Sequence, residues 1–192
     1  MDCTGAEKFA QQMGIPLVDQ KYFYTEERWR SLQKMKQSEK HGDGGGRSNF
    51  IISDQDRHGT VGAVALDQAG NLAAATSTGG TTNKKVGRIG DSPVIGAGTF
   101  ANNATCAVSA TGDGEFFIRI VAAHDVSALI EYRGMSLADA TQQVLDKVAN
   151  LGGTGGLIAI DSHGNIAQPF NSSGMYRGSI DQTGKTSVAI YR

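Results

Sequence analysis

The chain has 192 residues and a formal net charge of −1, with 18 Lys and Arg side chains against 19 Asp and Glu. This length allows one domain with a real core, and the balanced charge excludes the basic surface of a nucleic-acid-binding protein. Two cysteines are too few for a disulfide framework and fit a reducing cytoplasm. No apolar run reaches the roughly 18 residues of a membrane span, so we expect a cytoplasmic protein without membrane or nucleic-acid partners.

The first 59 residues predict two helices and a linker. Apolar residues recur at helical spacing from Gly5, and Gly14 is a natural helix stop. Thr25 predicts the N-cap of a second helix, which we expect to run to about Gln37. Residues 38–59 show no sustained periodicity, which indicates a mobile, protease-accessible linker.

Beyond the linker, the sequence predicts hairpins. The pattern predicts two strands around a turn at residues 60–66 and 71–78. A second hairpin is expected at residues 157–167, because both segments share the pattern D-x-x-G-N-[LI]-A. Further strands are expected at residues 104–110 and 187–191. One helix is expected to begin near Gly114 and to continue past Leu129, and Ser136 caps another that ends near Asn150. Hairpins and amphipathic helices without strict βαβ order predict an α+β fold of antiparallel sheets covered by helices.

Several common catalytic sites are excluded by the motifs. The sequence contains no G-x-S-x-G elbow and no G-x-x-x-x-G-K-[ST] loop, and its four histidines lack metal-ligand spacing. Hydroxyl and glycine residues near strand ends remain, and Thr60 is prominent among them. A threonine hydroxyl is a weak nucleophile unless a base lies beside it, and cleavage before the threonine frees its own α-amine for that role. The reference pKa of an α-amine, about 7.7–8.0, suits such a base. The duller alternative is a β-branched residue that opens a strand.

Long motifs carry a resemblance to a known family. They are HGTVGAVALDQAGNLAAATSTGGTTNKKVGRIGDSPVIGAGTFANN, AVSATGDGEFFIR and GGLIAIDSHGNIAQPFNSSGMYRG, with GAEKFAQQMG and YFYTEERW before the linker. The sequence closely resembles the plant-type L-asparaginase/isoaspartyl peptidase family of N-terminal nucleophile hydrolases. The resemblance implies an αββα sandwich and an autoprocessing amidohydrolase that acts on L-asparagine and β-aspartyl dipeptides.

The resemblance also implies residue roles. Cleavage between Gly59 and Thr60 releases Thr60 as nucleophile and general base, and Thr78 supports its hydroxyl. Residues 1–59 are then the end of an α-subunit and residues 60–192 the β-subunit. The subunits form an αβ heterodimer, which assembles as a dimer of heterodimers.

Substrate recognition is implied for a second group. Arg88 and Asp91 hold the α-carboxylate and the α-amino group, a match of an arginine fork to a carboxylate and of a carboxylate to an ammonium. Thr111 and Gly112 form the oxyanion hole, and Gly114 lines the substrate pocket. The alternative is that Arg88 and Asp91 form a surface ion pair of little value.

One departure from the family stands out. Its members normally begin with a long N-terminal portion that carries a His-Gly-Gly strand and an Asn-Ala-Gly loop binding a structural sodium ion. Residues 1–59 match neither motif. We therefore expect an incomplete sandwich, no catalytic cofactor and no metal ligands in this chain.

Two other readings stay open. The chain can be a truncated, inactive relative that serves as a binding or assembly subunit. Within the enzymes, glycosylasparaginases and taspase-like endopeptidases are the nearest competitors, and the run Thr78-Gly79-Gly80 favours the asparaginase/isoaspartyl branch.

Overall fold

The computed structural model describes residues 3–40 and 58–192 and divides the chain into two compact units, Met1–Ile52 and Ser53–Arg192. The first unit contains α1 (Cys3–Gln12), the 3₁₀ helix η1 (Gln20–Phe23) and α2 (Glu26–Lys40). Most of the predicted linker, residues 41–57, lies outside the described residues. In the two described ranges, no helix has both the length and the apolar character needed to cross a membrane.

The predicted stop of α1 at Gly14 and the predicted N-cap of α2 at Thr25 are confirmed. Gly14 adopts a φ of 71° after α1, and its N–H donates to the Gln11 carbonyl at 3.0 Å. Thr25 caps α2, because its Oγ1 accepts the N–H of Arg28 at 3.3 Å. The helix continues through Lys40, three residues beyond the expected Gln37.

The second unit contains three antiparallel sheets. β1 pairs with β2, a four-stranded sheet has the order β3-β4-β5-β6, and β7 pairs with β8. The bounds are β1 His58–Leu66, β2 Leu72–Thr81, β3 Thr99–Ala101, β4 Cys106–Gly112, β5 Gly155–Asp161, β6 Ile166–Ala167, β7 Arg177–Ile180 and β8 Thr186–Ala189. The strands expected from the sequence are confirmed, whereas β3 and β7 were missed because runs of three and four residues carry little periodicity.

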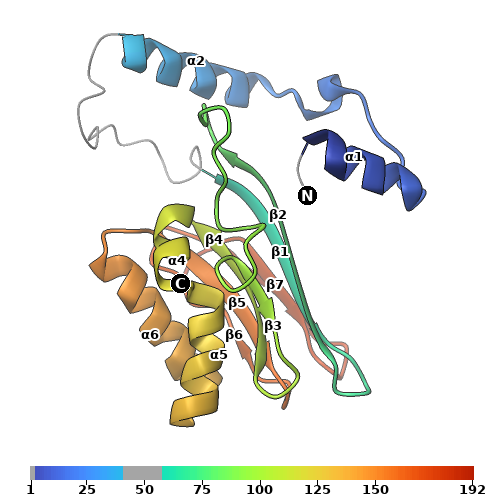
Figure 1. Cartoon of the computed structure of the whole chain (residues 1–192), viewed down its shortest axis with the longest axis vertical. Helices are drawn as coiled ribbons and strands as arrows, with labels where there is room; N and C mark the ends of the chain where they lie inside the picture. Colours follow the sequence, from blue (N-terminus) through green and yellow to red (C-terminus); the bar gives the residue numbers. More distant parts are fainter. Residues whose placement is uncertain (1–2, 41–57) are drawn as a thin grey trace. The chain divides into compact units, whose positions relative to one another are not determined.

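The central sheet separates two layers. Cys106, Val108 and Ala110 on one face of β4 join the hydrophobic core with α4 (Gly114–Ile120), α5 (Ala122–Arg133) and α6 (Leu137–Asn150). The alternate residue Ser109 faces the β1–β2 hairpin, as the twofold period of a strand requires. Figure 1 shows α5 and α6 side by side on the helical face of β4 and β5. The α+β fold with antiparallel sheets covered by helices is therefore confirmed.

The single helix expected from Gly114 past Leu129 is wrong, because the chain breaks at Val121. Val121 adopts a left-handed φ of 51° and ends α4. The N–H groups of Ala123 and His124 then donate to the carbonyls of Ala97 and Gly96, at 3.1 and 2.8 Å. These donors begin α5, and the adjacent loop satisfies them in place of the preceding helical turn. The start of α6 follows the prediction, since Ser136 Oγ accepts the N–H of Asp139 at 3.1 Å.

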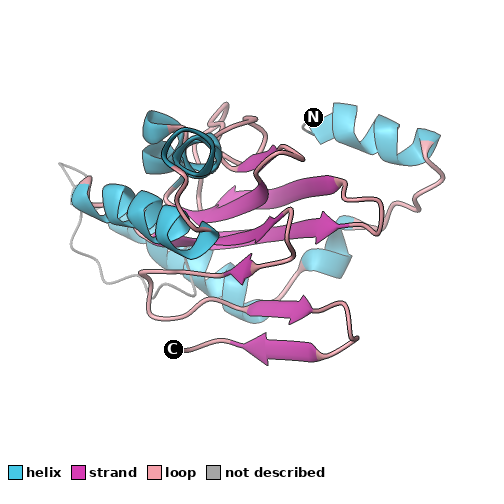
Figure 2. Ribbon diagram, turned by 90° about the horizontal axis from the view of Figure 1, so that it is seen from below, coloured by secondary structure: helices cyan, strands magenta, loops and turns pink. Residues whose placement is uncertain are grey.

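In the part of the chain that the structure describes, the repeated turn motif occurs three times. Asp67, Asp161 and Asp181 each open a tight turn and accept the N–H groups two and four residues later through one carboxylate oxygen. The glycine three residues after each aspartate has a φ of 82–84°, which glycine adopts without steric cost. The sequence reveals the first two copies only, because the third has Lys185 where the others have Asn. This third turn joins β7 to β8, the last two strands of the chain, and lies at the end of that hairpin opposite to the C-terminus (Figure 2).

The β1–β2 hairpin lies very close to β4. A Cβ at Gly62 would overlap Ser109 Oγ and lie 2.8 Å from its Cβ, so only glycine fits there. The Thr76 hydroxyl lies 2.6 Å from Ser109 Oγ. At the turn end of the hairpin, the Leu72 N–H donates to Asn103 Oδ1 at 2.7 Å, just before β4 begins. β1 and β4 therefore run in opposite directions across the interface.

We expect Gly62→Ala to lower the free energy of unfolding by about 1–3 kcal/mol, because the added methyl group forces the hairpin away from β4. Urea denaturation measures the change. In a Gly62→Ala/Ser109→Gly double variant the loss should be smaller than the sum of the two single losses. Additive losses would show that Ser109 does not limit the approach of the hairpin.

Candidate active site

Thr60 and Thr78 face each other across the β1–β2 hairpin. The strand register pairs the two residues, and the Thr60 hydroxyl donates to Thr78 Oγ1 at 3.0 Å. Both side chains are half-buried and belong to the face that is turned toward β4. The candidate nucleophile and its candidate supporting hydroxyl thus lie in direct contact.

The hairpin ladder is irregular at this point. The register shifts between His58 and Thr60, so three steps along β2 oppose two steps along β1. Gly80 provides the extra residue at a φ of 83°, and its N–H donates to Thr78 Oγ1 at 2.9 Å. Bulges of this kind re-aim side chains and are common beside active sites. The irregular step contains Gly59 and thus the Gly59–Thr60 bond.

The end of β4 lies at this same end of the hairpin. Gly62 of β1 and Ser109 of β4 are in contact. Because the two strands run in opposite directions, Thr60, two residues before Gly62, and Thr111, two residues after Ser109, lie on the same side of this contact. Thr111 and Gly112 are the last residues of β4 and lead directly into α4. Both candidate oxyanion residues are therefore at the threonine end of the two sheets.

Asp91 lies against the first residue of α4. Its residue exposure is 6%, and its Oδ2 is buried without a hydrogen-bond partner among the residues the structure describes. A Cβ at Gly114 would lie 2.5 Å from Asp91 Oδ1, and one at Gly98 would lie 2.8 Å from Oδ2. The two glycines allow the carboxylate to occupy this cramped position.

Burial raises the pKa of the Asp91 carboxyl above its ordinary value. Backbone N–H groups of Asp91 and Ser92 and the positive charge of Arg88 act in the opposite direction. A buried carboxylate with an unpartnered oxygen lacks a cation, which a substrate ammonium group can supply.

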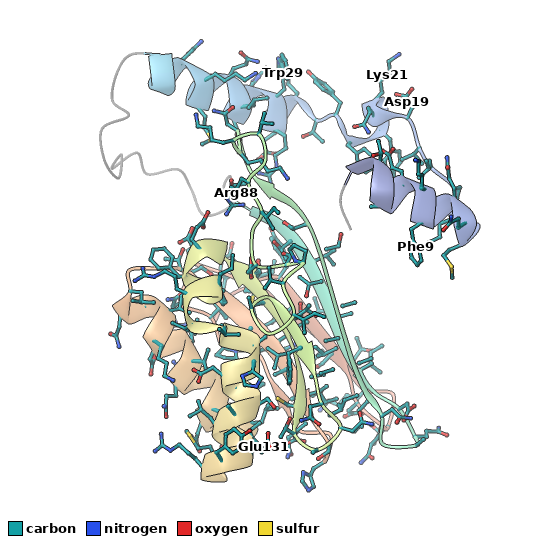
Figure 3. The ribbon with its side chains drawn as sticks, viewed as in Figure 1. Phe9, Asp19, Lys21, Trp29, Arg88 and Glu131 are labelled. Carbon is teal, nitrogen blue, oxygen red and sulfur yellow. The ribbon has the colours of Figure 1, made fainter. Side chains whose placement is uncertain are left out.

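The alternative of a surface ion pair requires Arg88 to contact Asp91. The Arg88 side chain contacts a different carboxylate. Its Nε donates to Oε1 of Glu115 at 2.8 Å, and its Nη2 forms an ion pair with the same oxygen at 2.6 Å. Glu115 is the second residue of α4 and follows Gly114 directly. Figure 3 shows the labelled Arg88 side chain beside the upper end of α4. Arg88, Asp91 and Gly114 are thus gathered around the start of one helix.

Two residues connect the threonine pair with this cluster. Thr76, on the same face as Thr78, donates its hydroxyl to the Gly98 carbonyl at 3.0 Å, and Gly98 in turn contacts Asp91. Thr76 therefore lies inside β2, and its hydroxyl links the hairpin to the loop that holds Asp91. Sequence reasoning missed the roles of Thr76, Gly98 and Glu115. The only signal for Glu115 was an acidic residue in the first turn of a helix.

Asp113 fixes the bend that follows the candidate oxyanion residues. Its Oδ2 accepts the N–H and the hydroxyl of Thr154, at 3.0 and 2.9 Å, and so ties the start of α4 to β5. Cys106 is a fully buried core residue, and burial raises the pKa of its thiol to about 11.

Residues 3–40 and 58–192 bring no three His, Cys, Asp or Glu side chains together as a metal site. The Asn-Ala-Gly sequence that the resemblance associates with sodium occurs nowhere in the printed sequence.

Comparisons with known proteins give a consistent family. Residues 1–190 match the asparaginase family Asparaginase_2. An isoaspartyl peptidase of Salmonella typhimurium is 51% identical over 98% of this chain and 60% of its own length, and the Escherichia coli isoaspartyl peptidase is 50% identical over 98% and 58%. A Mus musculus isoaspartyl peptidase/L-asparaginase is 42% identical over 97% and 54%. The chain thus spans about three-fifths or less of the length of these curated relatives. On the full extent of the family match, the chain belongs to the asparaginase family.

Proposed function

We propose that the protein is an autoprocessing amidohydrolase that cleaves L-asparagine and β-aspartyl dipeptides with Thr60 as an N-terminal nucleophile. The observation that carries this proposal is the contact of Thr60 Oγ1 with Thr78 Oγ1 at the irregular Gly59–Thr60 step. The relatives named isoaspartyl peptidase and L-asparaginase support the substrate class.

The first chemical step uses two groups of one residue. After cleavage of the Gly59–Thr60 bond, Thr60 Oγ1 attacks the β-carbonyl carbon of the substrate and its proton passes to the free α-amine. Thr78 Oγ1 lies 3.0 Å from the attacking oxygen, and its hydroxyl can donate to that oxygen once the Thr60 proton has moved to the α-amine. The carbonyl oxygen becomes an oxyanion, for which we propose the Thr111–Gly112 segment as donor.

The tetrahedral intermediate then collapses. The C–N bond breaks, and the leaving nitrogen takes the proton from the Thr60 ammonium to leave as ammonia or as the amine of the released amino acid. A β-aspartyl ester on Thr60 remains. Water attacks this ester with the α-amine as base, and aspartate leaves as the threonine hydroxyl is restored.

The cluster at the start of α4 fits the zwitterionic head of an aspartyl substrate. The Arg88 guanidinium can take the α-carboxylate, and Asp91, buried with an unpartnered oxygen, can take the α-ammonium. Both groups lie near the end of β4 that carries Thr111. The proposal therefore places head recognition and bond cleavage at one end of the sheets.

The proposal extends to assembly and compartment. Self-cleavage yields residues 1–59 as the end of one subunit and residues 60–192 as the other, in an αβ heterodimer that pairs with a second one. A free, buried Cys106 is compatible with a cytoplasmic protein.

Thr60→Ala should abolish self-cleavage and lower kcat for L-asparagine by at least about 10⁴-fold, because it removes the attacking oxygen. Intact-mass measurement and N-terminal sequencing check the cleavage, and ammonia release checks hydrolysis. Thr60→Ser keeps a hydroxyl and is the matched control, which should still process itself. Hydrolysis at the wild-type rate by Thr60→Ala would rule out the mechanism.

Arg88→Ala should raise KM for L-asparagine by about 10²-fold, because the α-carboxylate loses its bidentate partner. Self-cleavage should proceed normally, since the cleaved bond has no free α-carboxylate. Steady-state kinetics and intact mass measure the two effects. Exposed Arg133→Ala, at the end of α5, is the control of equal charge change. An Arg88→Ala protein that stays uncut would show that this arginine serves the fold or the processing step.

Asp91→Asn should lower kcat/KM by about 10²-fold and yet raise the free energy of unfolding near neutral pH. The folded-state pKa of Asp91 is raised, so the unfolded chain releases this proton first as the pH rises above about 3.8. Wild-type stability therefore falls with pH through the raised pKa, and the neutral amide lacks this loss. Urea titrations at several pH values check the sign. The free energy of unfolding of Asp91→Asn minus that of wild type should increase from acidic to neutral pH. A decrease of this difference over the same range would contradict the prediction.

A further inference from the structure

We infer that Glu115 is a positioning residue, which holds one edge of the Arg88 guanidinium so that the adjacent Nη1–Nη2 end can receive the substrate carboxylate. The inference rests on the proposed function and adds a residue to it. Glu115 Oε1 accepts the Nε–H of Arg88 at 2.8 Å and forms an ion pair with Nη2, which lies 2.6 Å away. Both nitrogens belong to a single edge of the guanidinium plane.

The adjacent Nη1–Nη2 end of the guanidinium has no acidic partner at Nη1 among the described residues. This end shares Nη2 with the edge that Glu115 holds, but Nη2 carries a second N–H, so Nη1 and Nη2 can together bind a carboxylate bidentately. Gly90 lies beside this end: a Cβ there would be 3.4 Å from Nη1 and 3.9 Å from Nη2. Glycine at this position adds no side chain against the end that the ligand needs.

Arg88 is the more buried partner of this ion pair and Glu115 the more exposed one, as expected if Glu115 orients Arg88 rather than stabilising the fold. The Arg88 side chain is 20% exposed, and the Glu115 side chain is 59% exposed. An ion pair with so exposed a partner contributes little to folding stability. It does restrain a long side chain with many rotamers, which lowers the ordering cost when a ligand binds.

A competing role predicts the reverse effect on affinity. If Glu115 occupied the edge used by the substrate, or mainly repelled its carboxylate, removing the Glu115 charge would strengthen binding. Glu115→Ala removes both the charge and the acceptor, whereas Glu115→Gln keeps an acceptor oxygen without the charge. The two substitutions therefore separate positioning from charge.

The test measures the affinity of the protein for L-aspartate by calorimetry, together with kcat and KM for L-asparagine. We expect Glu115→Ala to weaken aspartate binding and raise KM by about tenfold, with kcat and self-cleavage within about twofold of wild type. Glu115→Gln should stay within about threefold of wild type in all four. Glu131→Ala is the matched control, an exposed glutamate at the end of the unit opposite to Arg88 (Figure 3), and it should change nothing.

A double variant tests whether Glu115 acts on aspartate binding through Arg88. In an Arg88→Ala background, Glu115→Ala should cause no further loss of aspartate affinity, because the positioned group is gone. A further loss there, unchanged or tighter binding by Glu115→Ala, or failure of Glu115→Gln to restore affinity would each overturn the inference. A wild type that binds aspartate without hydrolysing asparagine would overturn the catalytic proposal alone. A wild type that does neither would overturn both.

Discussion

The close approach of the β1–β2 hairpin to β4 is the constraint on which the candidate site depends. Gly62 has no side chain because Ser109 occupies the space, and Ser109 in turn contacts the Thr76 hydroxyl. Since Thr76 donates its proton to the Gly98 carbonyl, the proton in the Ser109 contact must come from Ser109. One chain of hydrogen bonds therefore sets the height of the hairpin above the central sheet. The same hydrogen bonds therefore also fix the distance from the central sheet of the groups at the open end of the hairpin, including the Thr60 hydroxyl.

Charge at the site is divided between a buried and an exposed group. Asp91 is confined between glycines, and burial raises its pKa, so an ionised Asp91 makes the unliganded protein less stable. Arg88 is balanced by the exposed carboxylate of Glu115. Under the proposed function, the substrate ammonium relieves the first cost and its carboxylate joins a guanidinium that is already ordered. Such a site is stabilised by its ligand more than by its own folded contacts, as preorganised electrostatic sites often are.

Local features were predictable from the sequence, and non-local ones were not. The Thr25 and Ser136 caps and the first two Asp-opened turns are set by residues within four positions, and the structure confirms them. The break at Val121 depends on carbonyls more than twenty residues earlier in the chain, so helical periodicity alone continued the helix through it. The contact of Glu115 with Arg88 joins residues 27 positions apart. Family resemblance carried the roles of single residues, whereas packing decided which of them meet.

The fully buried Cys106 has a consequence for following the protein experimentally. With a thiol pKa of about 11, only about one Cys106 in ten thousand is ionised at pH 7, and the thiolate is the reactive form. Its neighbours in the core belong to the central sheet and to the helices that cover it. Alkylating reagents and peroxides can therefore reach this sulfur only when those layers separate. The rate at which Cys106 is labelled, followed by mass spectrometry, therefore reports how often the sheet–helix interface opens, without any engineered probe.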